Sequence, residues 1–396
     1  MTEIKAMKSI KQFIPFNSDL HDMMEDFRQM VNQCIRIGLE NNCSTLKRLS
    51  LLSYHQLDCK YVTSYKLNAI SQACGRLAQM KRDIKKGKKP RSPYIIKPYI
   101  TNCYGFKTNG VLFSIPYKPH HPINVLLNDY SQKVLSDTTL TIRSFTLNSE
   151  NSLSISVCKK ITPIQCTNVL GIDRNLGNIT VGNHKEITIY NTSKLLSIKE
   201  NTVRVMSTFK RNDHRILQQV SSKLGRRRTN RVNTLLHNIS KKIVQNAVET
   251  KSMIVFEDLK GIRKLYRKGN GQGNRYRRKL NSWSFYELQR QIEYKAKWEG
   301  IPVEKIDAKH TSQVCPRCEG KLQEDRKHKR DLWCSDCKRW QDRDVVASMN
   351  IAYKGWLRHI HPKGDTVETM RGNVNPLILR VDVSKPRRKS NDQPKR

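Results

Sequence analysis

The chain of 396 residues contains 74 lysines and arginines against 34 aspartates and glutamates, a formal net charge of +40. A charge of this size opposes compaction unless a polyanion neutralises it, so nucleic acid is favoured as the partner over a ribosomal-type or membrane-surface role. No apolar run approaches the roughly 20 residues of a membrane span, and no signal-peptide core begins the chain. We therefore expect a soluble, cytoplasmic protein that associates with the nucleoid of a prokaryote.

The N-terminal half is expected to form a β-barrel-like domain with a helical unit inserted in it. Residues 8–16 alternate apolar and polar side chains as a strand does, and helical spacing follows from about Ser18 to Lys86. A basic run closes the helical unit, and short β-rich pieces separated by turns follow it. The expected boundaries are residues 1–17 and 91–166 for the barrel and residues 18–90 for the helical unit.

From Asn168 onward the pattern is strand, strand, strand, helices, strand, helix, strand, which is the order of an RNase H-like α/β domain. The expected strands are residues 169–173, 179–181, 187–190, 253–256 and 302–306, and the expected helices are residues 232–247, residues 283–299 and a last helix from Asp344. We expect this domain to occupy residues 167–309 and 342–360. The basic tail over residues 361–396 is expected to be at least partly disordered.

Two Cys-x-x-Cys pairs, Cys315 with Cys318 and Cys334 with Cys337, are separated by fifteen residues. This spacing places four thiolates tetrahedrally around one zinc ion, with each pair closing a tight turn. The pattern predicts a structural zinc ribbon over residues 310–341. The other seven cysteines have no paired spacing, and we expect free, mostly buried thiols at Cys34, Cys43, Cys59, Cys74, Cys103, Cys158 and Cys166.

Three carboxylates stand where an RNase H-like domain concentrates its acids: Asp173 ends the first strand, Glu257 ends another, and Asp344 opens the last helix. Phosphodiester hydrolysis by two Mg²⁺ ions about 3.5–4 Å apart needs several convergent carboxylate oxygens. Each acid also has an ordinary structural explanation, because Asp enters turns and acids at a helix start favour the helix dipole. Asp342 and Asp307 are rival candidates for the third role.

Residues 201–280 hold 21 lysines and arginines but 4 aspartates and glutamates, a net charge of +17. A solvated helix surface normally mixes the two signs, so this excess indicates a channel for a polyanion. Within it, residues 261–281 are rich in Gly, Arg and Lys and are expected to form a loop.

Four segments carry a resemblance: Gly171-Ile-Asp-Arg-Asn-Leu-Gly-Asn178, Phe256-Glu-Asp-Leu259, Thr311-Ser-Gln-Val-Cys-Pro-Arg-Cys318 and Asp342-Arg-Asp-Val-Val-Ala-Ser-Met-Asn-Ile351. They resemble the RuvC motifs and zinc ribbon of TnpB, the transposon-encoded RNA-guided nuclease family ancestral to type V CRISPR effectors. Specific motifs cover about residues 169–353. The N-terminal half agrees in layout alone, as a wedge barrel with an inserted helical recognition domain.

The resemblance implies a RuvC-type endonuclease with two Mg²⁺ ions at Asp173, Glu257 and Asp344 and one structural Zn²⁺ at the four cysteines of the ribbon. It implies a guide RNA from the protein's own locus and a double-stranded DNA target beside a short transposon-adjacent motif. Both strands would be cut in a single RuvC site, and the gene would accompany an insertion-sequence element. A monomer is expected, with the oligomeric state left open.

The chain departs from the family pattern at three positions. Asn175 stands where the family usually has Gly, and Asn tolerates the left-handed conformation. Val346 stands where the family usually has Asn, so an amide is missing near Asp344. The Gly that often follows the second zinc cysteine is shifted to Gly320, behind Glu319.

Three alternatives to this interpretation stay open. A compact type V CRISPR effector shares every motif, and only the accompanying RNA separates the two. A non-cleaving RNA-guided DNA-binding regulator is a second alternative, although the three intact acids argue against it. An unguided transposition protein is the third.

Overall fold

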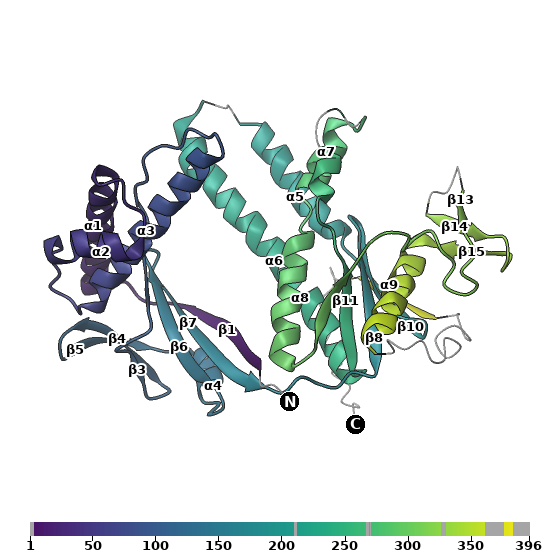
Figure 1. Ribbon diagram of the computed structural model, residues 1–396, viewed down its shortest axis with the longest axis horizontal. Helices are drawn as coiled ribbons and strands as arrows, with labels where there is room; N and C mark the ends of the chain where they lie inside the picture. Colours follow the sequence, from purple (N-terminus) through teal and green to yellow (C-terminus); the bar gives the residue numbers. More distant parts are fainter. Residues whose placement is uncertain are drawn as a thin grey trace, which may run out of the picture. The chain divides into compact units, whose positions relative to one another are not determined.

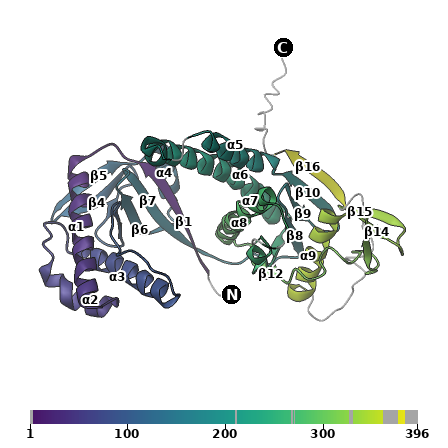
Figure 2. The ribbon, with the colours of Figure 1, turned by 90° about the horizontal axis from the view of Figure 1, so that it is seen from above.

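The structure is a computed structural model that describes residues 4–209, 212–266, 269, 271–325, 330–360 and 376–382. The chain divides into two compact units, Lys5–Lys160 and Ile161–Arg396 with the first four residues. Each unit has its own helices and sheets (Figures 1 and 2). The predicted α/β multidomain class is confirmed by this arrangement. Among the described residues, none of the helices combines the length and apolarity that a bilayer crossing requires.

The unit Lys5–Lys160 combines two small sheets with a helical insertion. A four-stranded sheet has the order β1-β7-β6-β2, and a three-stranded sheet has the order β3-β4-β5. Three helices are inserted in the chain between β1 and β2, and α1 packs against α3 through buried side chains such as Met23, Phe27 and Ala73. The elements are β1 (Ile4–Phe13), α1 (Ser18–Glu40), α2 (Leu46–Ser53), η1 (Tyr54–Gln56), α3 (Ser64–Lys85), β2 (Tyr99–Asn102), β3 (Lys107–Thr108), β4 (Leu112–Lys118), β5 (His121–Leu126), α4 (Asp129–Leu135), β6 (Thr141–Asn148) and β7 (Ser152–Ile161).

The second unit is built on a six-stranded sheet with the order β12-β11-β8-β9-β10-β16. Strand β9 runs antiparallel to both of its neighbours, while β8, β11 and β12 are parallel to one another. The strands are β8 (Asn168–Arg174), β9 (Asn178–Gly182), β10 (Glu186–Asn191), β11 (Ser252–Glu257), β12 (Val303–Ile306) and β16 (Leu377–Asp382). The helices are α5 (Ser193–Ser207), η2 (Ile216–Val220), α6 (Ser221–Glu249), η3 (Ile262–Tyr266), α7 (Asn274–Asn281), α8 (Phe285–Glu299) and α9 (Arg343–His359).

The two faces of this sheet have separate cores, because side chains of a strand point alternately to opposite faces. Ile172 and Phe256 pack on one face against α6 and α8. Val169 and Val255 pack on the other face against Ile351 and other residues of α9. Figure 1 shows α8 and α9 on opposite sides of the strands. Side chains two residues apart on a strand point to the same face. Asp173, two residues after Gly171, and Glu257, two residues after Val255, therefore lie on the face that α9 covers.

Helix α9 lies unusually close to β8, and glycine makes this approach sterically possible. A Cβ on Gly171 would lie 2.2 Å from the backbone oxygen of Ser348 and 2.6 Å from the backbone nitrogen of Ala352. The Ser348 hydroxyl donates a hydrogen bond of 2.9 Å to the oxygen of Gly171. On the helix side, a Cβ on Gly355 would lie 2.6 Å from Val255. Backbone and backbone thus touch without an intervening side chain.

The predicted strands of this unit and helix α8 are confirmed with shifts of a few residues at their ends, whereas α6 begins at Ser221, well before the expected start at Val232. The prediction of a continuous loop over residues 261–281 is wrong, because Asn274–Asn281 forms α7 and Ile262–Tyr266 forms a short 3₁₀ helix. Strand β16 was not predicted, although Leu377–Asp382 pairs in parallel with β10. Most of the predicted tail, residues 361–375 and 383–396, lies outside the described residues.

The contact between β8 and α9 predicts opposite effects for two glycine substitutions. Gly171→Ala should lower the free energy of unfolding by about 2 kcal/mol or more, since the new methyl group meets backbone atoms that cannot turn aside. Gly225→Ala should raise it by up to about 1 kcal/mol, because Gly225 is inside α6 with no atom within 4 Å of the added Cβ. Thermal unfolding of both variants measures this. Equal melting temperatures would contradict the close packing.

Candidate active site and zinc site

Asp173 and Glu257 are placed side by side by the pairing of two parallel strands. Phe256 of β11 is in register with Ile172 of β8, so the next residues of the two strands, Glu257 and Asp173, are also neighbours. Both side chains are on the face of the sheet that α9 covers. Strand β8 ends here because the chain turns into β9. The backbone amide of Asn175 donates to the backbone oxygen of Asn178 at 3.0 Å within this turn.

Asp344 reaches the same place from α9. Its neighbour Asp342 caps the helix: the Asp342 carboxylate accepts hydrogen bonds from the backbone amides of Asp344 at 2.8 Å and Val345 at 3.3 Å. This cap fixes the first turn, and Asp344 is 4% exposed. The side chain of Asn178, at the start of β9, donates to Asp344 Oδ2 at 2.8 Å. We call Asp173, Glu257 and Asp344 the acidic cluster.

The two rival acids are engaged elsewhere. Asp342 is occupied by the capping bonds of α9, and the exposed Asp307 accepts a hydrogen bond of 3.1 Å from the backbone amide of Lys309. The charges of Glu257 and Asp344 both act on the Asp173 carboxylate. The structure thus brings together the three acids that sequence reasoning ranked first, and their catalytic role stays a prediction.

Burial destabilises the charged forms of Asp173 and Glu257, and neighbouring carboxylates add to this effect at Asp173. The pKa of Asp173 is raised to about 7, first by burial and then by the charges of Glu257 and Asp344. Burial also raises the pKa of Glu257, opposed by a hydrogen bond from the Thr311 hydroxyl and by the charge of Arg174. The charges of Arg174 at Glu257 and of Arg330 at Asp344 offset part of this cost.

Arg174 braces the cluster from the opposite face of the sheet. Its guanidinium is 5% exposed, donates to the backbone oxygen of Glu257 at 2.7 Å and donates to Gln289 Oε1 at 2.7 Å. The guanidinium carbon lies 4.9 Å from the ring centre of Phe256 and 5.9 Å from that of Phe285. Burial lowers the pKa of Arg174 to about 10, so the group stays charged. It ties the end of β11 to α8.

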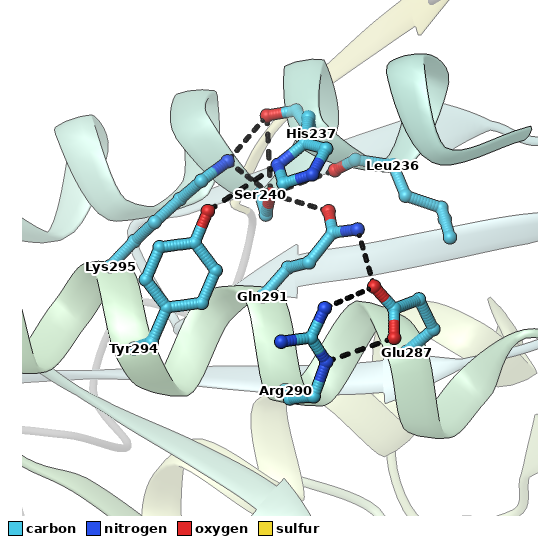
Figure 3. A network of polar contacts seen from close by, with 8 residues as sticks. All are labelled: Leu236, His237, Ser240, Glu287, Arg290, Gln291, Tyr294 and Lys295. Atoms are coloured by element: carbon cyan, nitrogen blue, oxygen red, sulfur yellow. Dashed lines mark hydrogen bonds and ion pairs between the residues drawn. The ribbon is translucent and has the colours of Figure 1, made fainter. Parts of the chain in front are cut away.

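Helix α8 is in turn held by a polar network to α6 (Figure 3). The Lys295 ammonium donates to Ser240 Oγ and to the backbone oxygen of His237, each at 2.7 Å. The Gln291 amide donates to Glu287 at 2.9 Å, and Glu287 also pairs with Arg290 at 2.7 Å. Burial lowers the pKa of Lys295 to about 8. The network orients α8 so that Gln289 faces Arg174.

The acidic cluster fits hard cations such as Mg²⁺. Its three carboxylates come from three different elements, and Mg²⁺ prefers oxygen ligands. Asn178 Oδ1 is buried without a hydrogen-bond partner among the described residues, so another oxygen acceptor is available beside Asp344. One cation of the chain is present: Arg330 pairs with Asp344 Oδ2 at 2.7 Å. That guanidinium is 61% exposed, so a metal ion can displace it at low cost.

The four predicted zinc cysteines form one cluster. Their sulfur atoms all lie within 4.8 Å of one another, with 3.8 Å between Cys315 and Cys337 and 3.4 Å between Cys318 and Cys334. A tetrahedral ion with Zn–S bonds of about 2.3 Å separates its sulfurs by about 3.8 Å. Three short strands carry the cluster: β13 (Leu322–Glu324), β14 (Asp331–Cys334) and β15 (Arg339–Asp342). The observed spacing fits zinc without rearrangement.

The turns after the cysteine pairs explain the shifted glycine. Glu319 and Lys338 directly follow Cys318 and Cys337, and both have left-handed backbones with φ of 62° and 50°. This conformation usually favours Gly. A Cβ on Gly320 would lie 2.1 Å from Oδ2 of the exposed Asp336, which can turn aside, and 3.2 Å from Cys318 Sγ, which is a tight contact.

Val346 joins the ribbon to α9. Its side chain is fully buried in one apolar cluster with Cys315, Leu322, Leu332 and Cys334. Two hydrogen bonds also hold α9 to the segment that precedes Cys315. The Asn350 amide donates to the backbone oxygens of Thr311 and Val314, each at 2.8 Å. Position 346 supplies no side-chain amide near Asp344. An amide does reach Asp344 from Asn178, at the start of β9.

Sequence reasoning did not assign roles to Arg174, Asn178, Thr311 or Arg330. The first three lie inside or beside the quoted motifs, so their positions were visible but their contacts were not. The sequence around Arg330 does not indicate its contact with Asp344. The β14–β15 hairpin brings these two residues together.

Comparisons with known proteins find similarity to TnpB-like and Cas12f1 proteins. Residues 285–351 match the family described as Cas12f1-like, TNB domain. TnpB-like protein MJ0751 of Methanocaldococcus jannaschii is 33% identical over 263 residues, which cover 63% of this chain and 92% of that protein. CRISPR-associated endodeoxyribonuclease Cas12f1 of Sulfoacidibacillus thermotolerans is 36% identical over 120 residues, which cover 30% of this chain and 26% of that protein.

One solved structure resembles the fold along its length. CasPhi-2 (Cas12j) bound to crRNA has a TM-score of 0.50 at 8% identity, covering 89% of this chain and 98% of that chain. Fold and site thus define an α/β multidomain protein with a four-cysteine cluster beside buried carboxylates. The chain belongs to the TnpB-like protein family, as its similarity to nearly the whole archaeal relative shows.

The cysteine cluster predicts one bound zinc ion per chain. Cys315→Ser should lose the ion and loosen the ribbon, because structural zinc stabilises the turns that hold it. Cys103→Ser is the matched control, since Cys103 is exposed and outside the cluster. Elemental analysis of the purified proteins gives the stoichiometry, and limited proteolysis reports the ribbon. A Cys315→Ser protein that keeps wild-type zinc would contradict the assignment.

The raised pKa of Asp173 predicts a pH-dependent stability. The folded chain binds a proton at about pH 7 that the unfolded chain binds at 3.8, so this group's contribution is full below pH 3.8 and falls as pH rises to 7. In EDTA, Asp173→Asn should therefore be more stable than wild type at pH 8, by on the order of 3 kcal/mol, and lose that advantage toward pH 4. Thermal unfolding across this range measures the difference.

Asp258→Asn is the control for this experiment. It makes the same charge change next to Glu257, but Asp258 is paired with Lys260 at 2.7 Å and its pKa is lowered. Parallel pH profiles for Asp173→Asn and wild type would show that the Asp173 carboxylate is not destabilised.

Proposed function

We propose that this chain is an RNA-guided DNA endonuclease that cuts its target by metal-dependent phosphodiester hydrolysis in a single RuvC-type site. Residues 167–309 and 342–360 would form the nuclease domain, with the zinc ribbon over residues 310–341 inserted in it. The unit before it would hold the wedge barrel over residues 1–17 and 91–166 and the helical recognition domain over residues 18–90. Its place in the cell would be with the DNA of the nucleoid.

The convergence of the three acids carries this proposal. The strand order β10-β9-β8-β11-β12, with β9 antiparallel, agrees with an RNase H-like sheet. Two of the acids stand at neighbouring strand ends, and the third begins the helix that covers them. An ordinary turn or helix cap does not need three neighbouring carboxylates, two of them buried, because burying unpaired charge is costly.

The residues of the cluster would divide the work. Asp173, Glu257 and Asp344 would hold two Mg²⁺ ions, which when bound supply an activated water and stabilise charge on the phosphate. Asn178 would orient Asp344, and Thr311 would orient Glu257. Arg330, released from Asp344, would be placed to contact a phosphate of the cut strand. No protein general base is required.

The charge and the relatives support nucleic acid as substrate and partner. A net charge of +40 suits an RNA–DNA heteroduplex held through its backbone. The curated relatives include CRISPR-associated endodeoxyribonucleases, and the CasPhi-2 structure contains crRNA. The partners proposed are a guide RNA from the protein's own locus and double-stranded target DNA beside a short adjacent motif. An association with an insertion-sequence element follows from the same family.

A compact type V CRISPR effector is the second candidate function. The Cas12f1 relatives favour it, although they match 26% and 29% of their own length. The TnpB-like relative matches over 92% of its length and favours the transposon-encoded type.

Replacing the acids predicts loss of cutting without loss of binding. Asp173→Ala, Glu257→Gln and Asp344→Asn should each reduce Mg²⁺-dependent cleavage of a guide-matched plasmid by about 10³-fold or more, because each removes a metal ligand. Binding of guide RNA should change less than about threefold, since phosphate contacts dominate affinity. Single-turnover cleavage and filter binding of the RNA–protein complex measure the two effects.

Asp258→Asn is the matched control and should cut at the wild-type rate. Wild-type cutting by Asp173→Ala would rule out the acidic cluster as the site. A wild-type complex that binds target DNA at saturating Mg²⁺ but leaves it intact would instead identify a non-cleaving regulator.

A further inference from the structure

A basic cleft of about 1150 Å³ lies between α5, α6, α7 and α8. Seven of the side chains that line it are lysine or arginine, and two are glutamate. Figure 1 shows α5 and α7 beside each other above the crossing of α6 and α8. We call this feature the basic cleft; the acidic cluster lies outside its lining.

The two glutamates of the basic cleft are already compensated. Glu200 pairs with Lys279 at 2.9 Å, and Glu287 pairs with Arg290 at 2.7 Å within the network of Figure 3. The remaining arginines have no such partner. Among the described residues, none forms an ion pair with the guanidinium groups of Arg204, Arg228, Arg275 and Arg278.

The positive charges are crowded enough to disfavour the empty state. Lys199 is half-buried and donates to Ser284 Oγ at 2.7 Å and to the backbone oxygen of Ser282. Its pKa is lowered to about 8, first by burial and then by the charge of Arg228. Repulsion of this kind is relieved by a bound anion, and four unpaired arginines suit several phosphates in a row.

The size and floor of the basic cleft suit a single strand. Apolar side chains of Leu196, Val203 and Val232 lie between the arginines, so sugar or base edges have an apolar surface beside the charges. Drug-sized ligands occupy about 300–1,000 Å³, so this volume takes roughly two or three nucleotides. Grooves for single strands combine positive charge with such surfaces.

The basic cleft also borders a cavity at the end of strand β8. A smaller cavity lined by Arg174, Asn175 and Trp283 shares three lining residues with it, Leu196, Lys199 and Ser284. Asn175 donates a hydrogen bond of 2.7 Å to Asp173. This smaller cavity lies on the face of the sheet that α6 and α8 cover, opposite the face that carries the acidic cluster.

We propose that the basic cleft binds the phosphate backbone of a single nucleic-acid strand beside the nuclease site. This inference rests on the proposed function for its biological ligand, which is either a segment of guide RNA or one strand of the opened target. The chemistry recognised is the same in both cases. Arg204, Arg228, Arg275 and Arg278 contact successive phosphates, and α7 forms one wall.

The test compares two adjacent arginines of α6 that differ in placement. Arg228 lines the basic cleft, whereas Arg227 is exposed and does not. Arg228→Glu should raise the Kd of the purified full chain for short fluorescein-labelled single-stranded DNA and RNA by about tenfold or more. Arg227→Glu should change it less than about twofold. Arg228→Ala should also reduce the slope of log Kd against log salt by about one phosphate contact.

Equal effects of Arg227→Glu and Arg228→Glu would overturn the proposal, as would a larger effect of Arg228→Glu on duplex than on single strands. Melting temperatures within about 2 °C of wild type ensure that both variants are folded. This binding assay needs neither guide nor cutting. An inactive protein that still shows the difference would therefore reject the proposed function and keep the basic cleft.

Cross-linking then identifies the source of the strand. A photoreactive benzoylphenylalanine at Val203, which lines the basic cleft and is 46% exposed, should cross-link in the assembled complex. A product with guide RNA assigns the RNA, and a product with one DNA strand assigns the opened target. The same probe at Arg227 is the control. Cross-linking to no strand at Val203 would contradict the proposal.

Discussion

The close contact between α9 and β8 is the constraint on which the site depends. Gly171 lets the backbone of the helix touch the backbone of the strand, and this sets the depth at which Asp344 meets Asp173. The same packing excludes water from the carboxylates, so their charges repel strongly. The fold therefore holds like charges close together, an arrangement that a bound cation would relieve.

The zinc ribbon belongs to this constraint and is not an independent module. Val346 of α9 is buried in the ribbon's core, and Asp342 both ends β15 and caps α9. Any loosening of the cysteine cluster is therefore transmitted to the first turn of the helix that carries Asp344. On the other face of the sheet, Arg174 connects the end of β11 to α8, and α8 is anchored to α6. The acidic cluster, the ribbon and the basic cleft are therefore connected through the same sheet and its helices.

Much of this was predictable from the sequence because the signals are local. Asp173 and Glu257 each follow a short apolar strand, and the cysteine spacing is specific to a ribbon. Contacts between distant residues were not predictable: Arg330 meets Asp344 through a hairpin, and Asn178 meets it through strand pairing. Helix α7 was missed because its sequence, rich in Arg and Lys, has a single buried residue, Leu280, to show periodicity. Strand β16 was missed because its pairing partner is far away in sequence.

The most direct test of the central claim is to express the protein from its native flanking locus and sequence the RNA that copurifies with it. A structured RNA whose 3′ end runs past the element's boundary is the predicted result, since it would supply the guide. A repeat-plus-spacer RNA would place the chain with the CRISPR effectors. Heterogeneous RNA, or none, would mean that the charge of +40 binds polyanions without a guide, and would contradict RNA-guided function.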